Sequence, residues 1–298
     1  MLSAVERKIE QYVIELDEPE ILRLYEKLPV GKRLRAKLIL RIAGADLRVI
    51  KTAAIVEMIH AASLLHDDVI DDADMRRKQP SINALYGNKT AIMFGDILYS
   101  KGFYELGDID KRVAQVVSNA VVQLSLGELK DVSLSESFNI NKDQYLKMIY
   151  QKTASLIEAS AESAAILAGK QPEIYRTYGR NLGLAFQMID DLLDITSDSE
   201  TLGKPALHDF VEGKTTLPYI YLYEELNTSD REILRSLHKK RLTAQEQGWI
   251  MLKMKEHRVI EKSYLEARVL IDEAIALMTN AGEQELTAIA KEMIERDF

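Results

Sequence analysis

The sequence predicts an all-α fold. Apolar residues recur at helical spacing through stretches such as 110–132 and 143–169, whereas alternating runs typical of strands are scarce. With 47% hydrophobic residues and six prolines, the chain can bury a large core and shows no linker rich in Pro, Gly or Ser. We therefore expect one domain, residues 1–298, of about ten or more helices around a central cavity.

Turn signals divide the predicted helices along the chain. The first stretch, MLSAVERKIEQYVIEL, has charges spaced through it, so it is an amphipathic helix and not a signal peptide. Asn227 begins a polar group typical of a helix N-terminus. Other breaks fall at 28–31, 78–80, around Gly107, at 169–172 and across 203–218. No repeat of 20 to 50 residues is visible, which argues against a solenoid.

The composition excludes several classes of function. The chain has no cysteine, which rules out disulfides and thiolate metal sites and fits a cytoplasmic protein. No run approaches the ~18 apolar residues of a membrane span, so we expect no integral membrane protein. A net charge of −8 argues against a nucleic-acid partner but allows a small anionic substrate with local basic contacts.

Two aspartate clusters of one design stand out: DDVID at Asp67, Asp68 and Asp71, and DDLLD at Asp190, Asp191 and Asp194. On a helix, positions i and i+4 project from one face, so the first and last aspartate of each cluster form a pincer of carboxylates. Repulsion within each pair of carboxylates destabilises an isolated helix by roughly 0.2 to 0.5 kcal/mol. A cation would offset this repulsion. Magnesium is the natural candidate, because it takes hard oxygen ligands from one or two carboxylates, water and phosphate.

The alternative for either cluster is a solvated acidic helix face. The preceding stretches, IVEMIHAASLLH and NLGLAFQMI, are largely apolar, so the carboxylates come at the ends of buried helical stretches. This arrangement is typical of the lining of a cavity.

Basic residues recur at loops and helix ends near these clusters. Gly31, Gly203 and Gly213 directly precede lysines, which lets the backbone approach a polyphosphate closely. Each cation alone is weak evidence, because most such residues are solvated surface. The set is Lys32, Arg35, Arg76, Arg77, Lys152, Lys204 and Lys214.

In these residues the chain resembles the trans-isoprenyl diphosphate synthases of the polyprenyl synthetase family. The resemblance rests on GKRLR at 31–35, HxxxxxHDDVIDxxxxRR at 60–77, GD at 95–96, KT at 152–153, FQMIDDLLD at 186–194 and GKPALHDFVEGKTTLP at 203–218. Members share an all-helical fold around a deep cavity and usually form homodimers. Many have a second glycine and a proline where this chain has Val30 and Ala36, and neither side chain carries the chemistry.

The resemblance implies a magnesium-dependent prenyltransferase that condenses isopentenyl diphosphate with an allylic diphosphate. Isopentenyl diphosphate would be held by Lys32, Arg35, His60 and Arg77. The allylic diphosphate would be held by Arg76, Lys152, Thr153, Gln187, Lys204 and Lys214. Three magnesium ions would be held by Asp67, Asp71 and Asp190, while Asp68, Asp191 and Asp194 would orient ligands and basic side chains. The catalytic set would be Asp67, Asp71, Asp190, Lys152 and Lys204.

Other interpretations of the same residues are weaker. The HDD at 66–68 is similar to HD-domain phosphohydrolases, but only His60 lies upstream, on nearly the same helix face. A ferritin-like di-iron site needs two ExxH motifs, and Glu57 to His60 is the only one. A catalytically silent regulatory subunit would typically lose one aspartate motif, whereas both are intact.

Product length is predicted from two small residues before the first cluster. Ala62 and Ser63 lie one turn deeper than Asp67 on the same helix, where a growing tail must pass. Short-chain members of the family commonly carry a bulky residue here, so we expect a longer all-trans product, C30 to C40, of the kind used for quinone side chains. The alternative is a short-chain synthase that makes a C15 or C20 product. In that case the two small residues would serve only to let helices pack closely.

Overall fold

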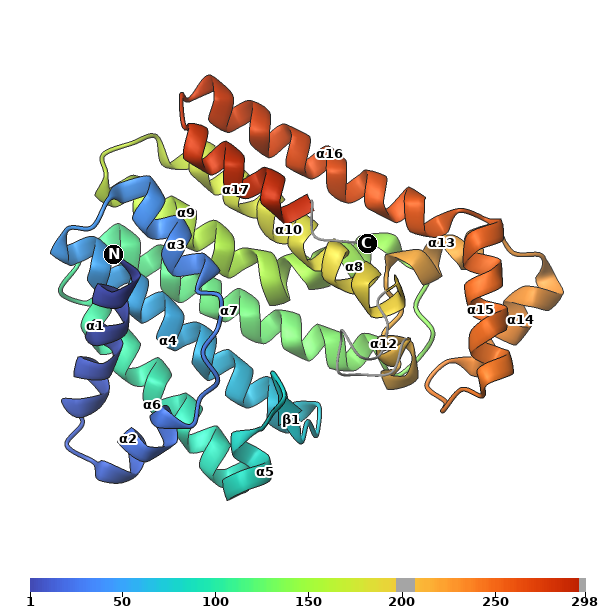
Figure 1. The fold of residues 1–298 in the computed structure, drawn as a ribbon, viewed down its shortest axis with the longest axis horizontal. Helices are drawn as coiled ribbons and strands as arrows, with labels where there is room; N and C mark the ends of the chain where they lie inside the picture. The colour runs from blue at the N-terminus through green and yellow to red at the C-terminus, as the bar shows by residue number, and fades with distance from the viewer. Residues whose placement is uncertain (197–206, 295–298) are drawn as a thin grey trace. The chain divides into compact units, whose positions relative to one another are not determined.

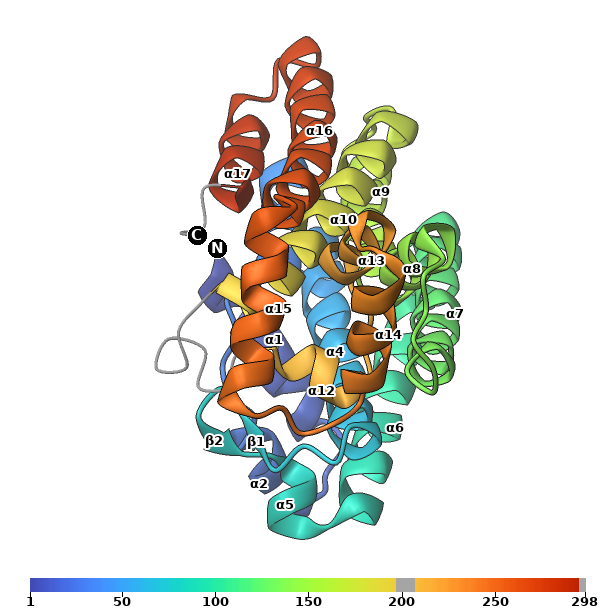
Figure 2. The same cartoon turned by 90° about the vertical axis from the view of Figure 1, so that its right-hand side faces the viewer.

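A computed structural model describes residues 1–196 and 207–294 of the chain (Figures 1 and 2). The described residues are almost entirely helical, which confirms the all-α prediction. The one sheet among them is a two-stranded antiparallel hairpin. The chain forms two compact units, residues 1–122 with 156–179, and residues 123–155 with 180–298.

The first unit contains the N-terminal helices. Its elements are α1 (Leu2–Ile14), α2 (Pro19–Glu26), α3 (Leu34–Ala43), α4 (Leu47–Ile70), β1 (Met75–Arg76), β2 (Gln79–Pro80), α5 (Ile82–Tyr86), α6 (Asn88–Leu106), the first half of α7 (Lys111–Leu134), most of α9 (Ser155–Leu167) and the start of α10 (Pro172–Thr196).

The second unit contains the C-terminal helices. Its elements are the end of α7, α8 (Lys142–Ile149), the π-helix η1 (Tyr150–Ala154), most of α10, α12 (His208–Glu212), α13 (Leu217–Glu225), α14 (Thr228–Leu237), α15 (Ala244–Glu256), α16 (Val259–Asn280) and α17 (Gln284–Ile294). Asn227 caps α14 by accepting a hydrogen bond from the Asp230 N–H, as its position in the sequence predicts.

Helix α4 forms the centre of the first unit's core and ends at the first aspartate cluster. Its side chains from Ala53 to Ile59 are all buried. Gly102 allows α6 to pack closely, because a Cβ there would lie 3.4 Å from the Ile55 Cγ2. At the end of α4 the Asp71 N–H donates to the Asp67 carbonyl at 2.8 Å. The two aspartates are therefore one helical turn apart.

Helix α4 is also long and apolar enough to cross a membrane by length and composition alone. The expectation that no segment would reach that level is therefore wrong for this helix. In the structure 61% of the apolar window is buried, as in the core helix of a folded protein, so the feature is weak evidence for a span.

In the second unit, two glycines bring neighbouring helices against η1. A Cβ on Gly127 of α7 would lie 2.3 Å from the Lys152 backbone nitrogen, and one on Gly183 of α10 would lie 2.5 Å from the Ala154 Cα. Only glycine fits at such distances. The backbones of α7 and α10 therefore fix the place of η1, which carries Lys152 and Thr153.

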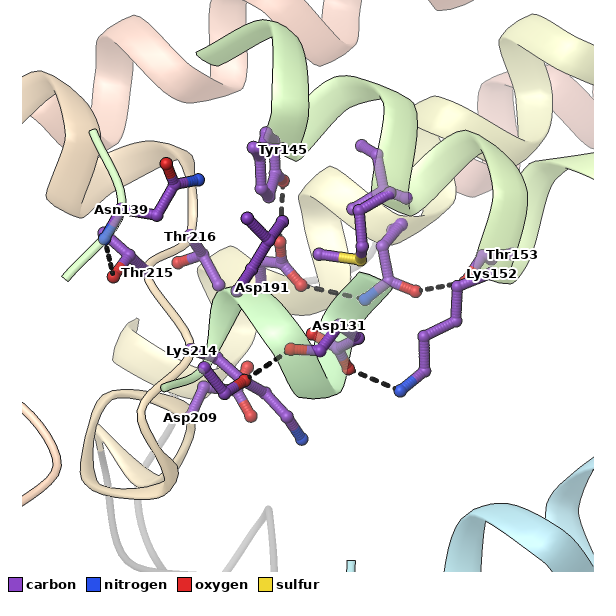
Figure 3. Close-up of a pocket in the computed structure, with 15 residues that line it drawn as sticks. Asp131, Asn139, Tyr145, Lys152, Thr153, Asp191, Asp209, Lys214, Thr215 and Thr216 are labelled. Carbon is purple, nitrogen blue, oxygen red and sulfur yellow. Dashed lines mark hydrogen bonds and ion pairs between the residues drawn. The ribbon is translucent and has the colours of Figure 1, made fainter. Parts of the chain in front are cut away.

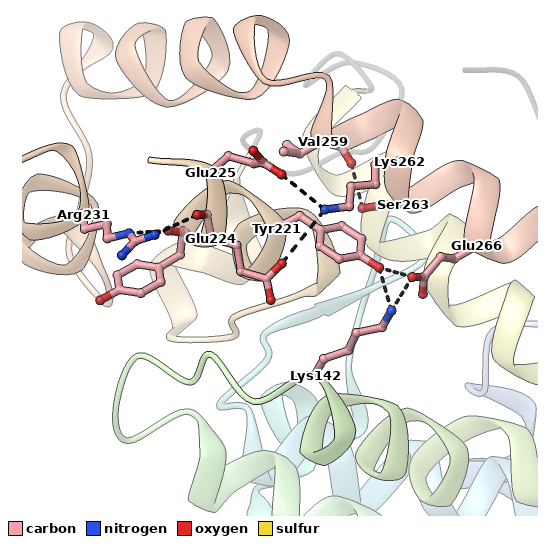
Figure 4. Close-up of polar contacts among 10 residues, drawn as sticks. Lys142, Tyr221, Glu224, Glu225, Arg231, Val259, Lys262, Ser263 and Glu266 are labelled. Atoms are coloured by element: carbon pink, nitrogen blue, oxygen red, sulfur yellow. Dashed lines mark hydrogen bonds and ion pairs between the residues drawn. The ribbon is translucent and has the colours of Figure 1, made fainter. Parts of the chain in front are cut away.

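Polar contacts join α13 to α8 and α16 (Figure 4). The Tyr221 hydroxyl donates to Glu266, and Lys142 pairs with the same carboxylate. Lys262 lies 4.0 Å from the centre of the Tyr221 ring. Burial, reinforced by the bond to Glu266, raises the pKa of Tyr221 to about 12, so this hydroxyl stays protonated.

Candidate active site

The first aspartate cluster is joined to the hairpin that follows it. Asp68 is buried, and its Oδ1 accepts from the Arg76 Nε at 2.7 Å and lies 2.6 Å from Nη2. Asp67 is partly buried and Asp71 is exposed. Two guanidinium nitrogens thus bind Asp68, and the role of Asp67 and Asp71 as metal ligands stays a prediction.

Four arginines surround His60 in the first unit. Burial, followed by the charges of Arg35, Arg77, Arg76 and Arg33, holds the pKa of His60 well below 6.5. Burial likewise lowers the pKa of Arg35, opposed by the charge of Glu57. The Arg35 Nε is buried and has no hydrogen-bond partner among the described residues. This basic cluster is strongly positive and is suited to a bound anion.

Glu57, which stands out in the sequence only as part of an ExxH motif, supports this basic cluster. It is 2% exposed; its Oε1 accepts from the Ala36 N–H at 2.9 Å, and its Oε2 lies 3.4 Å from the Arg33 Nη1. Arg33 also pairs with Glu6 at 2.6 Å. Glu57 therefore holds Arg33 and the backbone of Ala36 by charge-assisted hydrogen bonds.

The backbone near the cluster is strained in several places. Arg33, Arg77 and Lys78 adopt left-handed conformations with φ of 52°, 52° and 64°, which are uncommon for residues with a side chain. Gly31 lies directly against Arg77, because a Cβ there would lie 2.6 Å from its Nη1. Such strain is frequent at functional sites. Lys32, the remaining predicted residue of this group, is exposed.

The second aspartate cluster lies on α10 beside a polar pocket (Figure 3). Asp191 accepts from the Tyr145 hydroxyl at 2.6 Å and from the Gln187 Nε2 at 2.8 Å. The Thr153 hydroxyl donates to Gln187 at 2.7 Å. Burial, with the charge of Asp209, raises the pKa of Asp191 well above its usual range. Asp191 therefore orders two predicted diphosphate-binding residues.

The other two aspartates of this cluster differ in exposure. Asp190 is exposed, and Asp194 is buried and accepts from the Asp209 N–H at 3.2 Å. Asp190 is thus the member of the cluster that reaches solvent.

Each described lysine of the predicted allylic site is paired with carboxylates. Lys152 lies 2.6 Å from Asp131 and 2.9 Å from Glu128, and Lys214 lies 2.8 Å from Glu212. Burial opposes ionisation of Glu212, but bonds from His208 and Lys214 bring its pKa to about 2. The two lysines of this region are therefore paired with three carboxylates, so their positive charge is more than offset. Lys204 lies outside the described residues.

Several of these residues are not among those predicted from the sequence. Glu128 and Asp131 stand in GELKD on α7, where a glycine is followed by two acids. Asp209 lies inside the motif at 203–218, and Tyr145 has no signal of its own in the sequence. Arg76 belongs to the first unit, while the other described members of its predicted set belong to the second.

The donor set fits magnesium. Among the described residues, no three His, Asp or Glu side chains are grouped closely enough to hold a metal by themselves. Magnesium does not need such a group, because it usually binds one or two carboxylates and completes its shell with water and phosphate oxygens. Asp67, Asp71 and Asp190 offer such carboxylates, whereas Asp191 already accepts two hydrogen bonds.

The two residues predicted to set product length lie where α4 is buried. Ala62 has no exposed surface, and Ser63 is partly buried with its hydroxyl donating to the His60 carbonyl at 2.9 Å.

Known proteins match this chain in sequence and in fold. A family model described as polyprenyl synthetase matches residues 19–251. The short chain isoprenyl diphosphate synthase of Methanothermobacter thermautotrophicus is 37% identical over 246 residues, covering 78% of this chain and 76% of that protein. The octaprenyl diphosphate synthase of Escherichia coli is 39% identical over 226 residues, covering 73% and 68%.

Two solved structures resemble almost the whole chain. Octaprenyl pyrophosphate synthase from Helicobacter pylori has a TM-score of 0.94 at 45% identity, covering 99% of this chain and 98% of that one. Polyprenyl synthase from Caulobacter crescentus, in complex with calcium and isoprenyl diphosphate, has a TM-score of 0.90 at 30% identity, covering 100% and 95%. The chain therefore belongs to the polyprenyl synthetase family and is a trans-prenyltransferase.

Proposed function

We propose that this enzyme condenses isopentenyl diphosphate with an allylic diphosphate in successive steps to make a long-chain all-trans polyprenyl diphosphate of C30 to C40. The observation that carries the proposal is the pairing of two aspartate clusters with two distinct sets of cations. One set acts on His60, and the other comprises Lys152 and Lys214, while Arg76 acts on His60 and is also assigned to the allylic diphosphate. Two diphosphates of different kinds fit two such sets.

The basic cluster of the first unit is the proposed isopentenyl diphosphate site. Arg35 offers a buried Nε without a partner, and Arg77 donates to the Pro29 carbonyl at 3.1 Å. Arginine forks bind diphosphate oxygens in bidentate fashion. His60, neutral in this field, adds a hydrogen bond, and the exposed Lys32 adds a mobile charge.

The allylic diphosphate is proposed to bind beside the second cluster, with Arg76, Lys152, Thr153, Gln187, Lys204 and Lys214 as its contacts. Lys152, Lys204 and Arg76 stabilise the negative charge that develops on diphosphate as the carbon–oxygen bond breaks. Asp67, Asp71 and Asp190 would hold magnesium, with three ions expected, and the bound metal would supply Lewis-acid stabilisation of that leaving group. Asp68, Asp191 and Asp194 orient the cations and ligands around it.

The allylic cation left behind is attacked by the double bond of isopentenyl diphosphate, which Lys32, Arg35 and Arg77 orient. Loss of one proton then forms the new trans double bond. No described side chain stands out as a dedicated base. The departing diphosphate is the proposed acceptor.

Product length is tested by mass analysis of products made from farnesyl diphosphate and labelled isopentenyl diphosphate. We expect C30 to C40. Replacing Ala62 or Ser63 by Phe places a ring in the proposed path of the tail and should shorten the product to C15 or C20. Wild-type product that stops at C15 or C20, or two Phe variants with unchanged product, would contradict the tunnel assignment.

A short-chain synthase is the second candidate, favoured by the name of the relative from Methanothermobacter. The same mass analysis distinguishes the two candidates. A silent regulatory subunit is opposed by the carboxylates of both clusters, and turnover by the purified chain alone would exclude it.

We further propose a single-domain, cytoplasmic homodimer, not integral to a membrane. The borders between the two units fall within α7 and α10 and at the start of α9, and not in linkers, which favours one domain. Helix α6 exposes Met93 and Tyr104 at 56% and 76%, an apolar surface suited to a second copy. Sedimentation equilibrium tests the dimer.

A further inference from the structure

His238 follows α14 and contacts the loop that carries Lys214. Its Nε2 lies 2.7 Å from the Gly213 carbonyl and 3.4 Å from the Thr215 hydroxyl. A carbonyl oxygen only accepts, so Nε2 carries the proton in this bond. The imidazole therefore holds the backbone one residue before Lys214.

The imidazole is itself held by aromatic packing. Its ring centre lies 5.4 Å from that of Phe138 and 5.5 Å from that of Phe210, both edge to face. Burial lowers the pKa of His238, although the bond to Gly213 acts in the opposite direction. The ring is thus a neutral donor with a fixed orientation at neutral pH.

Lys239, the residue after His238, makes further hydrogen bonds to the same region. The Lys239 N–H donates to the Phe210 carbonyl at 3.2 Å, and its Nζ lies 3.4 Å from the Ser135 carbonyl. Gly213 has φ of 97°, and a Cβ there would lie 2.5 Å from that Ser135 carbonyl. Residues 238–239 therefore bond both the loop after α7 and the loop before α13.

These two loops line the polar pocket beside the second aspartate cluster. Ser135 and Asn139 come from one loop, and Lys214, Thr215 and Thr216 come from the other. The loops are also bonded directly, because the Asn139 N–H donates to the Thr215 hydroxyl at 3.3 Å. Neither His238 nor Lys239 lines the pocket, so any effect of theirs passes through the loops.

We propose that His238 is a positioning residue that sets the place of Lys214 and Thr215 for the allylic diphosphate. The inference rests on the proposed function of that pocket. It predicts an effect on one substrate only, because the proposed isopentenyl diphosphate site lies among residues of the first unit.

The test compares three variants of the full-length enzyme. His238→Phe keeps an aromatic ring between Phe138 and Phe210 but removes the donor. His238→Gln restores an N–H donor. Lys240→Ala is the matched control, because Lys240 is an exposed cation two residues away.

Two readouts are measured for each variant. The first is the KM for farnesyl diphosphate and for isopentenyl diphosphate, with kcat. The second is calorimetric binding of farnesyl diphosphate with magnesium in the absence of isopentenyl diphosphate. Thermal melting checks that each variant is folded.

We expect His238→Phe to weaken farnesyl diphosphate binding and raise its KM about three- to tenfold, the range for loss of one neutral hydrogen bond. The KM for isopentenyl diphosphate should change less than twofold. His238→Gln should recover most of the loss, and Lys240→Ala should match the wild type.

Wild-type affinity for farnesyl diphosphate in a folded His238→Phe variant would overturn the inference. An equal rise of both KM values, or no recovery in His238→Gln, would also overturn it, because a merely structural role acts on both substrates. Failure of the proposed function would be seen separately, as absence of condensation by the wild-type enzyme.

Discussion

The basic cluster of the first unit and the lysines of the second unit are built differently. Around His60, burial and then the charges of four arginines lower the histidine pKa, and the buried carboxylate of Glu57 pairs with Arg33. In the second unit, Lys152 lies between Asp131 and Glu128, and Lys214 lies on Glu212. In the first region the four arginines outnumber the three carboxylates paired with them, Glu6, Glu57 and Asp68, whereas in the second region three carboxylates are paired with only two lysines.

For the proposed diphosphate sites, this difference indicates how each region would bind its ligand. A site with surplus cations attracts a bare anion, because binding relieves repulsion among the cations. A site with paired cations gains less, since each new ion pair replaces an existing one. The second region therefore needs additional positive charge, and magnesium at the exposed carboxylates can supply it.

The largest effect is expected when a metal-binding carboxylate is removed. Asp67→Ala or Asp190→Ala should lower kcat by at least about a hundredfold to a thousandfold, because loss of one preorganised electrostatic contact already costs that much. Steady-state kinetics measure the loss, and far-ultraviolet circular dichroism checks the fold. Near-normal turnover in either variant would remove the metal from the proposed mechanism.

Removal of the metal should affect ligand binding differently in the two regions. With EDTA present, calorimetric binding of farnesyl diphosphate should weaken more than about tenfold, since the paired lysines alone offer little net charge. Binding of isopentenyl diphosphate should change less than about threefold, because its arginines need no metal. Equal weakening of both ligands would show that the comparison of the regions is wrong.

The sequence predicted the elements better than the contacts. Helical spacing predicted that α4 and α10 present their aspartates one turn apart, because that spacing depends on local geometry alone. The roles of Glu57 and Glu128 depend on partners far away in the chain, Ala36 and Lys152. No local pattern carries that information.

The unusual backbone conformations could not be predicted from the sequence either. The π-helix η1 depends on the packing of Gly127 and Gly183 against it, and such bulges are frequent at functional sites. The left-handed residues Arg33 and Arg77 have no turn-forming residue type to reveal them. Tertiary contacts impose these conformations, and the His238 contacts arise in the same way.

A smaller effect is expected when the backbone approach at η1 is disturbed. Gly127→Ala should lower the free energy of unfolding by about 1–3 kcal/mol, the usual cost of overpacking, because the new Cβ would lie 2.3 Å from the Lys152 nitrogen. It should also weaken farnesyl diphosphate binding and spare isopentenyl diphosphate. The exposed helical Gly248→Ala is the control, since a Cβ there meets nothing within 4 Å. Urea unfolding measures both variants, and equal stabilities would contradict the packing argument.

The smallest effect is the pH dependence that His60 contributes. Its folded pKa lies well below 6.5, chiefly because of burial and then the arginines. Above pH 6.5 the histidine is neutral in both the folded and the unfolded chain, and its full contribution to stability is present. As the pH falls through 6.5, His60 becomes protonated in the unfolded chain but stays neutral in the folded protein. The free energy of unfolding therefore falls by at most about 1.4 kcal/mol per pH unit until the folded pKa is reached.

Replacement of His60 by Gln should remove that part of the slope. Urea unfolding at pH 7.5 and pH 5.5 measures it, and an unchanged difference between the two pH values in the variant would contradict the assignment. Binding of isopentenyl diphosphate should then raise the pKa of His60, because the anion offsets the arginine charges. Nuclear magnetic resonance titration of the five histidines follows that shift, and farnesyl diphosphate with magnesium should raise the pKa of His60 less, because only Arg76 among its four arginines is assigned to that ligand.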